Sequence, residues 1–274
     1  MIGVELGCLG VIAFYLGARA IRGDLAEFAR KAALLASAAW LGEDTCIRLY
    51  GFYSYSPAWH GAIDRVPVLV AVIWPLVILS ADTLARALRP RATAGARATL
   101  AGALVVLDAA FIEPASVQAG LWSWTVPGVF GVPLIGILGW GLFAGSALYA
   151  LERLPRRAAA ATLVLAPLAT HAMLIVGWWG LLRWLPRPLP DLGALAVVAP
   201  ASAALTWVIT RTGARVPMAE MVSRLVAATF FFVLLGVYAR EVGALVAYAA
   251  AFAPPYFTLM VVSWRPARAT PSAA

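Results

Sequence analysis

Long apolar runs dominate this sequence and leave few folds open to it. A helix that crosses a lipid bilayer needs about 20 mostly apolar residues, and several segments reach or approach that length. They are residues 3–20, 30–49, 66–86, 98–113, 130–151, 158–182, 191–210, 217–238 and 242–264. Backbone polar groups inside lipid must be hydrogen-bonded within the protein. The sequence therefore predicts an all-α, polytopic transmembrane helix bundle.

The number of spans depends on two places in the chain. The fourth segment is short, and the eighth and ninth are separated only by Ala239, Arg240 and Glu241, so we expect eight or nine spans. We predict a single transmembrane helical domain over residues 1–264. Residues 265–274 are expected to form a disordered cytoplasmic tail.

The composition excludes a water-soluble domain and argues against nucleic-acid binding. Of the 274 residues, 63% are hydrophobic and only 12% are charged, whereas a soluble domain carries roughly 25% charged residues. The net charge is +8, but the basic residues are scattered singly between apolar runs and form no basic helix face. The expected partners are therefore the lipid bilayer and lipophilic molecules, with no nucleic acid.

Lys and Arg are distributed unequally between alternate connections. With nine spans, 16 of these residues fall on one side of the membrane and 5 on the other. Cytoplasmic loops carry the excess of positive charge. We therefore predict an external N-terminus, a cytoplasmic C-terminus and a multi-pass protein of the inner (cytoplasmic) membrane.

Ionisable residues inside a bilayer are costly and mark functional sites by default. Several here have an opposite charge four residues away, which places both groups on one helix face and predicts a structural ion pair. These pairs are Asp44/Arg48, Asp82/Arg86 and Glu220/Arg224. Glu43, Asp108 and Glu113 have no such partner. They are the candidate catalytic residues, with a hydrogen-bonded structural acid as the alternative for each.

All three acids are predicted in the outer half of the bilayer. Glu43 lies near the outer end of the second span, and Asp108 lies roughly 12 Å of helix beyond Leu100. Glu113 precedes Pro114, and a residue before proline avoids helical geometry. We therefore expect the fourth helix to end at Glu113.

Two aromatic stretches fall on the same predicted side as these acids. The first contains Tyr53 and Tyr55, and the second contains Trp122 and Trp124. Interfacial anchoring alone explains many such residues. Aromatic faces also stabilise cations, and a carboxyl group in apolar surroundings keeps its proton longer. Together these residues would suit protonation of an alkene and shelter of the resulting carbocation.

No motif for a metal or a cofactor accompanies these residues. The sequence lacks HExxH, a nucleotide-binding glycine loop and an aspartate-rich diphosphate motif, so we predict no metal site and no cofactor. His171 has no second ligand at helical spacing, and we interpret it as a hydrogen-bonded core histidine.

The same residues stand in an order that resembles a known membrane family. In chain order they are Glu43, Tyr53-x-Tyr55, Val66-Pro67, Trp74, Asp108, Glu113-Pro114, Trp122-x-Trp124, Gly131-Val132-Pro133-Leu134 and Gly139-Trp140. Over residues 40–140 this pattern resembles the membrane carotenoid-biosynthesis family that includes bacterial and archaeal carotenoid 1,2-hydratases. The chain departs from the family at Glu113, where Asp is usual, and at Gly136-Ile137, where Asn-Phe is usual.

The resemblance implies a cofactor-independent hydro-lyase that adds water to a terminal carbon–carbon double bond of a long isoprenoid, most often a carotenoid. Asp108 or Glu113 would donate the proton, and Glu43 or the remaining acid would act as base on water. The substrate-binding residues would be Tyr53, Tyr55, Trp74, Trp122, Trp124 and Trp140. Other enzymes of the same pathway are expected partners.

Two alternatives remain open. If water is excluded, an internal double bond captures the cation and the enzyme is a terpene (isoprenoid) cyclase or isomerase. The missing amide at Gly136 keeps that alternative open. A transporter or a non-catalytic membrane partner is the second alternative, although the sequence contains no inverted repeat and no paired broken helices.

Overall fold

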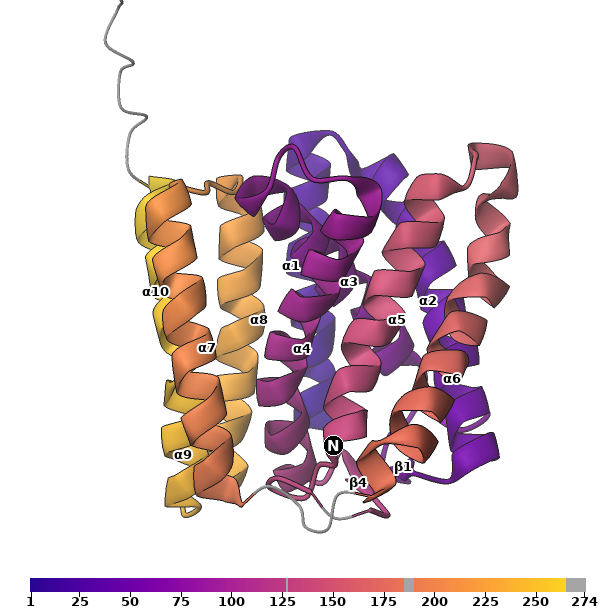
Figure 1. Ribbon diagram of the computed structural model, residues 1–274, viewed down its shortest axis with the longest axis vertical. Helices are drawn as coiled ribbons and strands as arrows, with labels where there is room; N and C mark the ends of the chain where they lie inside the picture. The colour runs from indigo at the N-terminus through magenta and orange to yellow at the C-terminus, as the bar shows by residue number, and fades with distance from the viewer. Residues whose placement is uncertain (127, 185–189, 265–274) are drawn as a thin grey trace, which may run out of the picture.

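The fold is a bundle of helices that run between the two ends of the molecule (Figure 1). The computed structural model describes residues 1–126, 128–184 and 190–264, so the predicted tail over residues 265–274 lies outside the described residues. The helices are α1 (Ile2–Arg22), α2 (Leu25–Tyr50), α3 (Val68–Leu88), α4 (Ala94–Gln118), α5 (Leu134–Arg153), α6 (Thr162–Gly180), α7 (Asp191–Thr212), α8 (Met218–Tyr238), α9 (Gly243–Ala250) and α10 (Ala253–Trp264). Short 3-10 turns at Arg156–Ala161 and Leu182–Trp184 flank α6.

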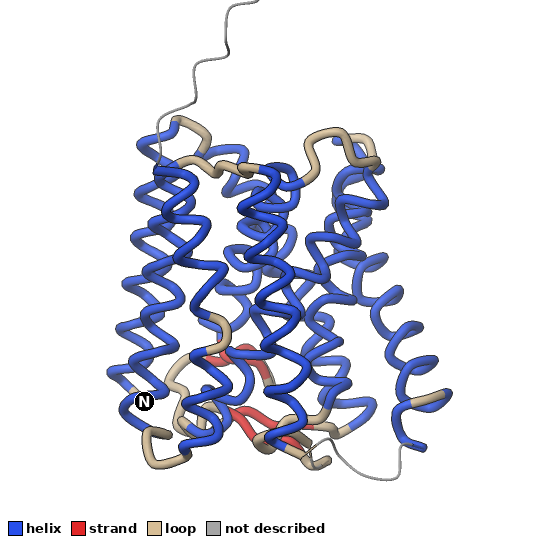
Figure 2. Tube along the Cα trace, turned by 60° about the vertical axis from the view of Figure 1, so that its left-hand side comes forward, coloured by secondary structure: helices blue, strands red, loops and turns tan. Residues whose placement is uncertain are grey.

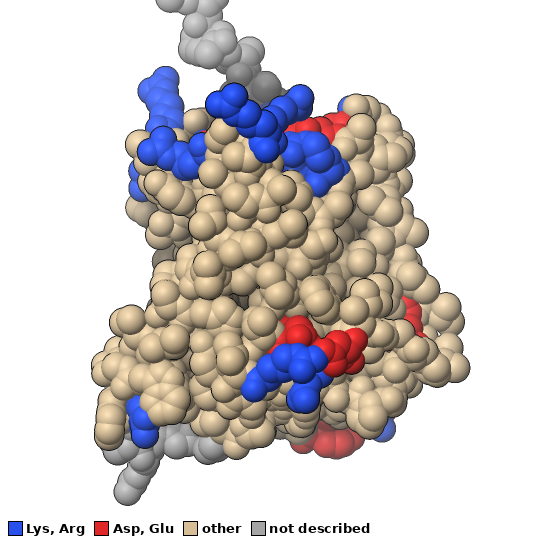
Figure 3. Space-filling view, turned by 90° about the vertical axis from the view of Figure 1, so that its right-hand side faces the viewer, with Lys and Arg blue, Asp and Glu red and all other residues tan. Residues whose placement is uncertain are grey.

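Within the described residues, 8 helical passes are long and apolar enough to cross a membrane, with α6 joined to its turns and α9 to α10. α2 has the length, but it carries charged side chains near both ends and does not belong to that set. On the face in Figure 3, Lys and Arg gather at one end, and a wide uncharged belt separates them from the charges near the other end. The chain is an all-α, multi-pass membrane protein, as predicted.

The fourth helix does not end at Glu113. α4 continues through Pro114 to Gln118, so the prediction drawn from the proline was wrong. Pro114 has no N–H to donate to the carbonyl oxygen of Ala110, one turn earlier. The hydroxyl group of Tyr248 donates a hydrogen bond to that oxygen at 2.9 Å. A side chain on α9 thus replaces the missing backbone hydrogen bond, as neighbouring helices do for proline in membrane proteins.

The last predicted span, 242–264, consists of two helices in one pass. The interruption between α9 and α10 lies at Ala251 and Phe252, directly before Pro254 and Pro255 in the first turn of α10. Proline fits the first turn of a helix but cannot continue a preceding one. The pass is therefore broken within its own length.

α3 and α4 lie between two groups of helices. α2, α5 and α6 lie on one side and α7 to α10 on the other, with α1 packed against α8 (Figure 1). α4 and α5 approach closely at Gly102, where a Cβ atom would lie 2.7 Å from the carbonyl oxygen of Gly141. Small residues allow membrane helices to pack at this distance. The close contact places Glu113 of α4 beside Trp140 of α5.

Short strands close one end of the bundle, the end that also holds the N-terminus (Figure 2). β1 (Tyr53–Tyr55) pairs antiparallel with β4 (Trp122–Trp124), and β2 (Ala62–Ile63) pairs antiparallel with β3 (Val66–Pro67). In the first pair, Tyr53 lies opposite Trp124 and Tyr55 lies opposite Trp122. Side chains alternate between the two faces of a strand, so all four aromatic rings share one face and the serines between them are exposed.

Two of the three predicted ion pairs are confirmed, Asp44–Arg48 at 2.7 Å and Asp82–Arg86 at 2.9 Å. The predicted pair between Glu220 and Arg224 was wrong. Glu220 lies 2.7 Å from Arg19, and Arg224 lies 3.0 Å from Asp108. Both partners are on other helices, and spacing within one helix cannot reveal them.

Candidate active site

A cavity lies among α2 to α6 and the β1–β4 sheet. Apolar and aromatic side chains form most of its wall. It brings together all but one of the predicted site residues: Glu43, Tyr53, Tyr55, Trp74, Glu113, Trp122, Trp124 and Trp140. Asp108 is the exception. Residues from five helices and two strands therefore converge on one chamber.

Glu43 on α2 accepts hydrogen bonds from three aromatic side chains. The indole N–H of Trp74 donates to Oε1 at 3.1 Å, and the hydroxyl group of Tyr55 donates to Oε2 at 3.0 Å. The hydroxyl group of Tyr53 donates to the same Oε2. Burial raises the pKa of both tyrosines well above the usual value. The two hydroxyl groups therefore keep their protons, so each can donate a hydrogen bond and its oxygen atom can also accept one.

Glu113 on α4 accepts hydrogen bonds from three indole groups. The N–H groups of Trp122 and Trp124 donate to Oε2 at 2.8 and 3.0 Å, and that of Trp140 donates to Oε1 at 2.7 Å. Glu113 is only 3% exposed, and these hydrogen bonds offset part of the cost of its burial. An indole N–H donates but cannot accept, so every one of these contacts requires an acceptor on Glu113.

Two indole rings connect the two carboxyl groups. Trp74, which binds Glu43, lies against Trp140, which binds Glu113, with ring centroids 4.3 Å apart. Phe143 meets Trp74 edge-on at 5.2 Å. Aromatic pairs at such distances gain stability beyond the area that they bury. The rings therefore fix the positions of both carboxyl groups, and all of the aromatic partners are uncharged.

Gly136, in the first turn of α5, leaves room for Trp124. A Cβ atom at this position would lie 2.6 Å from carbon atoms of the Trp124 ring, which is closer than side chains approach in folded proteins. The absence of a side chain therefore allows the indole to reach Glu113. The family that the sequence resembles usually has an amide side chain at position 136. In this chain the Trp124 ring lies in that space.

Asp108 lies outside this cavity and has a cationic partner. Its carboxylate is 3.0 Å from Arg224 on α8 and accepts a hydrogen bond from the hydroxyl group of Tyr256 on α10 at 2.9 Å. No cation lies near Asp108 in the sequence, so this ion pair depends on the packing of α4 against α8. A catalytic role for Asp108 stays a prediction, and the fold does not bring it to the two glutamates.

His171 on α6 also lines the cavity, although it is not among the site residues predicted from the sequence. It is hydrogen-bonded, as we expected of a core histidine. Its Nε2 lies 2.8 Å from the hydroxyl oxygen of Thr45, and its Nδ1 lies 2.9 Å from that of Tyr50. Both partners are on α2, 126 and 121 residues earlier in the chain. No spacing within α6 could have indicated this position.

The polar groups of the cavity suit proton transfer. They include two carboxyl groups, two tyrosine hydroxyl groups and one imidazole. Across the described ranges, no three or more His, Cys, Asp or Glu side chains form a group that could hold a metal ion. The carboxyl, hydroxyl and imidazole groups at the cavity suit acid–base chemistry inside an aromatic wall.

Comparison with known protein families gives evidence that is independent of the geometry of the site. A sequence model of the carotenoid biosynthesis protein family matches residues 6–200, which is more than half of the chain. The chain belongs to the carotenoid biosynthesis protein family. The resemblance inferred from the sequence is thereby confirmed, and membership indicates an enzyme of carotenoid biosynthesis. No curated protein and no solved structure gives a significant match.

In this carotenoid biosynthesis protein, the matched segment contains the whole lining of the cavity. Both glutamates, their aromatic partners and His171 all lie within it. Helices α8 to α10 lie beyond residue 200, outside the match. The cavity therefore lies wholly within the part of the chain that matches the family.

Proposed function

We propose that this carotenoid biosynthesis protein adds water to a carbon–carbon double bond of a long isoprenoid dissolved in the inner (cytoplasmic) membrane. It would act as a cofactor-independent hydro-lyase, a carotenoid hydratase. The supporting observation is the pair of glutamates that share one apolar cavity and are held only by uncharged aromatic donors. Acid–base catalysis needs one group that gives a proton and another that takes one.

The hydrogen-bond donors suggest a different role for each glutamate. Three indole N–H groups face Glu113, and a carboxylate supplies the acceptors that they require. Two of the groups that face Glu43 are hydroxyls, which can rotate and accept a hydrogen bond from a protonated carboxyl group. Glu43 is therefore the proposed proton donor and Glu113 the proposed base.

The reaction consists of two proton transfers around one addition of water. Glu43 gives its proton to the less substituted carbon of the double bond, so that a C–H bond forms and a tertiary cation remains. The oxygen atom of a water molecule bonds to the cation, and Glu113 takes the proton that this water releases. The product has gained one water. Return of the proton from Glu113 to Glu43 through solvent completes the cycle.

The cavity wall suits the cationic intermediate. Tyrosine and tryptophan rings surround the space, and aromatic faces attract cations. Once Glu43 has lost its proton, both glutamates are negatively charged, and no Lys or Arg among the described residues lines this cavity to pair with them. Charges that are already in place where a cation develops stabilise the transition state that leads to it.

Cyclisation is the second candidate, and the contact between Gly136 and Trp124 favours it. An indole ring fills the position where a polar side chain could help to orient water. With water excluded, an internal double bond of the substrate would capture the same cation, and loss of a proton would give an isomer of the substrate. The two candidates therefore differ in the mass of the product.

Co-expression in cells that accumulate acyclic carotenoids tests the proposal, with mass spectrometry of the extracted pigments. We expect a new pigment heavier than its precursor by one water molecule. A new pigment of unchanged mass would support cyclisation. If the protein inserts into the membrane and the pigments do not change, neither reaction occurs on these substrates and the proposal fails for them.

A further inference from the structure

A second cavity lies in the other half of the bundle, among α3, α4, α7, α8 and α10. Most of its wall consists of Leu, Ile and Phe side chains. Asp108, Arg224 and Tyr256 meet at this cavity from three different helices. None of the three lines the first cavity. This is therefore a separate polar site within an apolar chamber.

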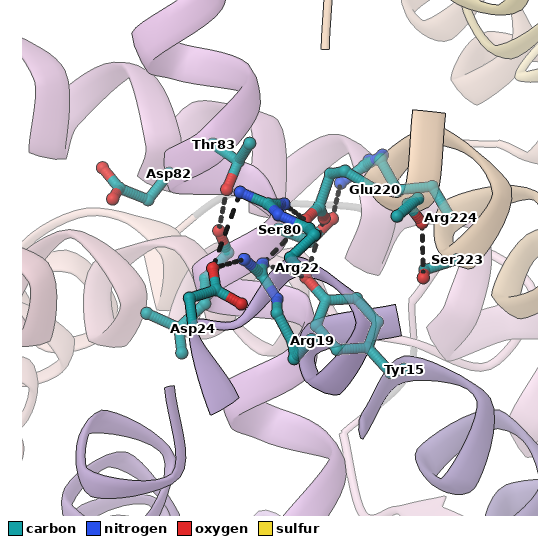
Figure 4. Close-up of polar contacts among 12 residues, drawn as sticks. Tyr15, Arg19, Arg22, Asp24, Ser80, Asp82, Thr83, Glu220, Ser223 and Arg224 are labelled. Carbon is teal, nitrogen blue, oxygen red and sulfur yellow. Dashed lines mark hydrogen bonds and ion pairs between the residues drawn. The ribbon is translucent and has the colours of Figure 1, made fainter. Parts of the chain in front are cut away.

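The charges at this site balance each other. One terminal nitrogen of Arg224 lies 3.0 Å from Asp108, and the other donates to the hydroxyl group of Ser80 at 2.9 Å. Glu220, one turn earlier on α8, binds Arg19 at 2.7 Å instead, as Figure 4 shows. The pair of Asp108 and Arg224 is thus electrically neutral by itself. An added charge would be costly to bury there, so the site favours a neutral ligand.

Two polar atoms at this cavity have no hydrogen-bond partner within the part of the chain that the structure describes. They are Nε of Arg224 and the hydroxyl oxygen of Ser202, and both residues line the cavity. The Arg224 side chain is 10% exposed and Ser202 is 3% exposed. Buried polar groups are nearly always hydrogen-bonded. Because Nε of arginine can only donate, the missing partner must carry an acceptor, such as an oxygen atom.

A groove on the bundle surface lies next to this position. Ser202 also lines that groove, together with Ala199, Ala203 and, from the interruption between α9 and α10, Ala251 and Pro254. Non-helical backbone at membrane depth is tolerated where it is buried in protein or lines a cavity. Ser202 therefore lies between this groove, which is lined by several small side chains, and the second cavity.

We propose that the second cavity binds a neutral lipophilic molecule that carries one oxygen function, an alcohol or a ketone. Its oxygen atom accepts a hydrogen bond from Nε of Arg224 and bonds to the hydroxyl group of Ser202, while its hydrocarbon chain lies along the apolar wall. Ser202, Arg224 and Tyr256 all lie beyond the segment that matches the family. This site binds its ligand whether or not the first cavity hydrates an alkene.

Equilibrium binding of radiolabelled phytanol, and of phytane as the alkane with the same carbon skeleton, tests this site. The full chain is used in lipid nanodiscs, and binding to empty nanodiscs is subtracted. We expect saturable binding of phytanol at least tenfold tighter than that of phytane. If the two bind alike, the oxygen is not recognised and water satisfies the two polar atoms, which overturns the proposal.

The Ser202→Ala variant identifies the position of the oxygen. We expect about a tenfold loss of phytanol affinity, the effect of one lost hydrogen bond, with phytane unaffected. Ser146→Ala is the matched control, because that hydroxyl group already donates to the carbonyl oxygen of Leu142. Leu205→Trp fills the chamber and should abolish phytanol binding. Unchanged phytanol binding in either the Ser202 or the Leu205 variant would place the ligand elsewhere and overturn the proposal.

Discussion

At the scale of single residues, the two glutamates of the first cavity differ in their hydrogen-bond partners. Glu113 meets three groups that can only donate, whereas two of the groups around Glu43 are hydroxyls that can donate or accept. Both residues are acids without a charged partner at helical spacing, yet the fold gives them different hydrogen-bond partners. Their partners decide which acid can carry a proton without leaving a donor unsatisfied.

Replacement of either glutamate by glutamine tests the assigned roles. Glu113→Gln places an amide NH2 among three indole N–H donors, and Glu43→Gln removes the transferable proton at nearly constant size. We expect each variant to lower hydration by about 10²–10⁴-fold, the usual contribution of a general acid or base. The control is Glu241→Gln, whose side chain is 89% exposed. Turnover close to wild type in either cavity variant would contradict the assigned role.

The sequence could indicate Glu43 and Glu113, because both are acids without a partner at helical spacing. It could not separate them from Asp108. Asp108 is equally isolated in sequence, and only the packing of α8 against α4 brings Arg224 within 3.0 Å of it. His171 was interpreted as a core histidine and not as a site residue for the same reason, since its partners are on α2. Local spacing in the sequence cannot reveal contacts between helices that are far apart along the chain.

At the scale of structural elements, the β1–β4 sheet explains why two aromatic stretches far apart in sequence act together. Each has an aromatic residue on either side of one serine, and this alternation places both rings on one face of a strand. The sequence placed both stretches on the same side of the membrane but did not predict strands. Three-residue strands are too short for their pattern to indicate them, and their pairing depends on how α2 and α4 end.

The Gly136→Ala variant tests the contact between α5 and this sheet. The new methyl group would overlap the Trp124 ring and displace its N–H from Glu113. We expect hydration to fall about tenfold, the equivalent of one lost hydrogen bond to a charged group. Gly236→Ala is the matched control, since a Cβ atom there has nothing within 4 Å. Equal turnover in the two variants would show that Trp124 does not depend on Gly136.

The Tyr248→Phe variant tests how α4 passes through Pro114. Loss of the hydroxyl group leaves the buried carbonyl oxygen of Ala110 without the hydrogen bond that replaces the backbone one. We expect a loss of about 1–3 kcal/mol in the free energy of unfolding, followed by thermal or denaturant unfolding in detergent. Tyr238→Phe, at a side chain that is 50% exposed, should change it little. A Tyr248 variant as stable as wild type would mean that Ala110 finds another donor.

Helix α4 also shows where prediction of helices from the sequence fails. Apolar runs indicated each helical pass to within a few residues, because burial in lipid requires length and hydrophobicity alone. The end of α4 was misjudged because the rule for residues before proline describes a chain without neighbours. Tyr248 lies more than a hundred positions later, and the 138-residue separation is invisible to any local pattern.

At the scale of the whole molecule, the bundle has two polar centres in separate halves. The carboxyl–aromatic cavity belongs to the segment that matches the family, and the Arg224 site is completed by helices beyond it. The charge distribution along the sequence predicts that the first cavity faces the outer side with the N-terminus. The β1–β4 sheet and the N-terminus do lie at the same end of the bundle (Figure 2).

Cysteine labelling tests the predicted orientation in the membrane. In a background without Cys8 and Cys46, we expect a membrane-impermeant maleimide to label the Ser54→Cys variant on intact cells. The Pro90→Cys variant, at the opposite end, should react only after the cells are permeabilised. Both positions are exposed, so access to the reagent decides the result. The reverse pattern would place the first cavity on the cytoplasmic side.

The central claim is that the two glutamates add water to an isoprenoid double bond. Its most direct test is turnover of an acyclic carotenoid by the purified protein in nanodiscs, in water enriched in oxygen-18, with mass spectrometry of the product. We predict a product that carries one labelled oxygen atom with the wild-type protein, and a loss of that product with Glu43→Gln and with Glu113→Gln. An unlabelled product, or a labelled product formed equally well by both variants, would contradict the account.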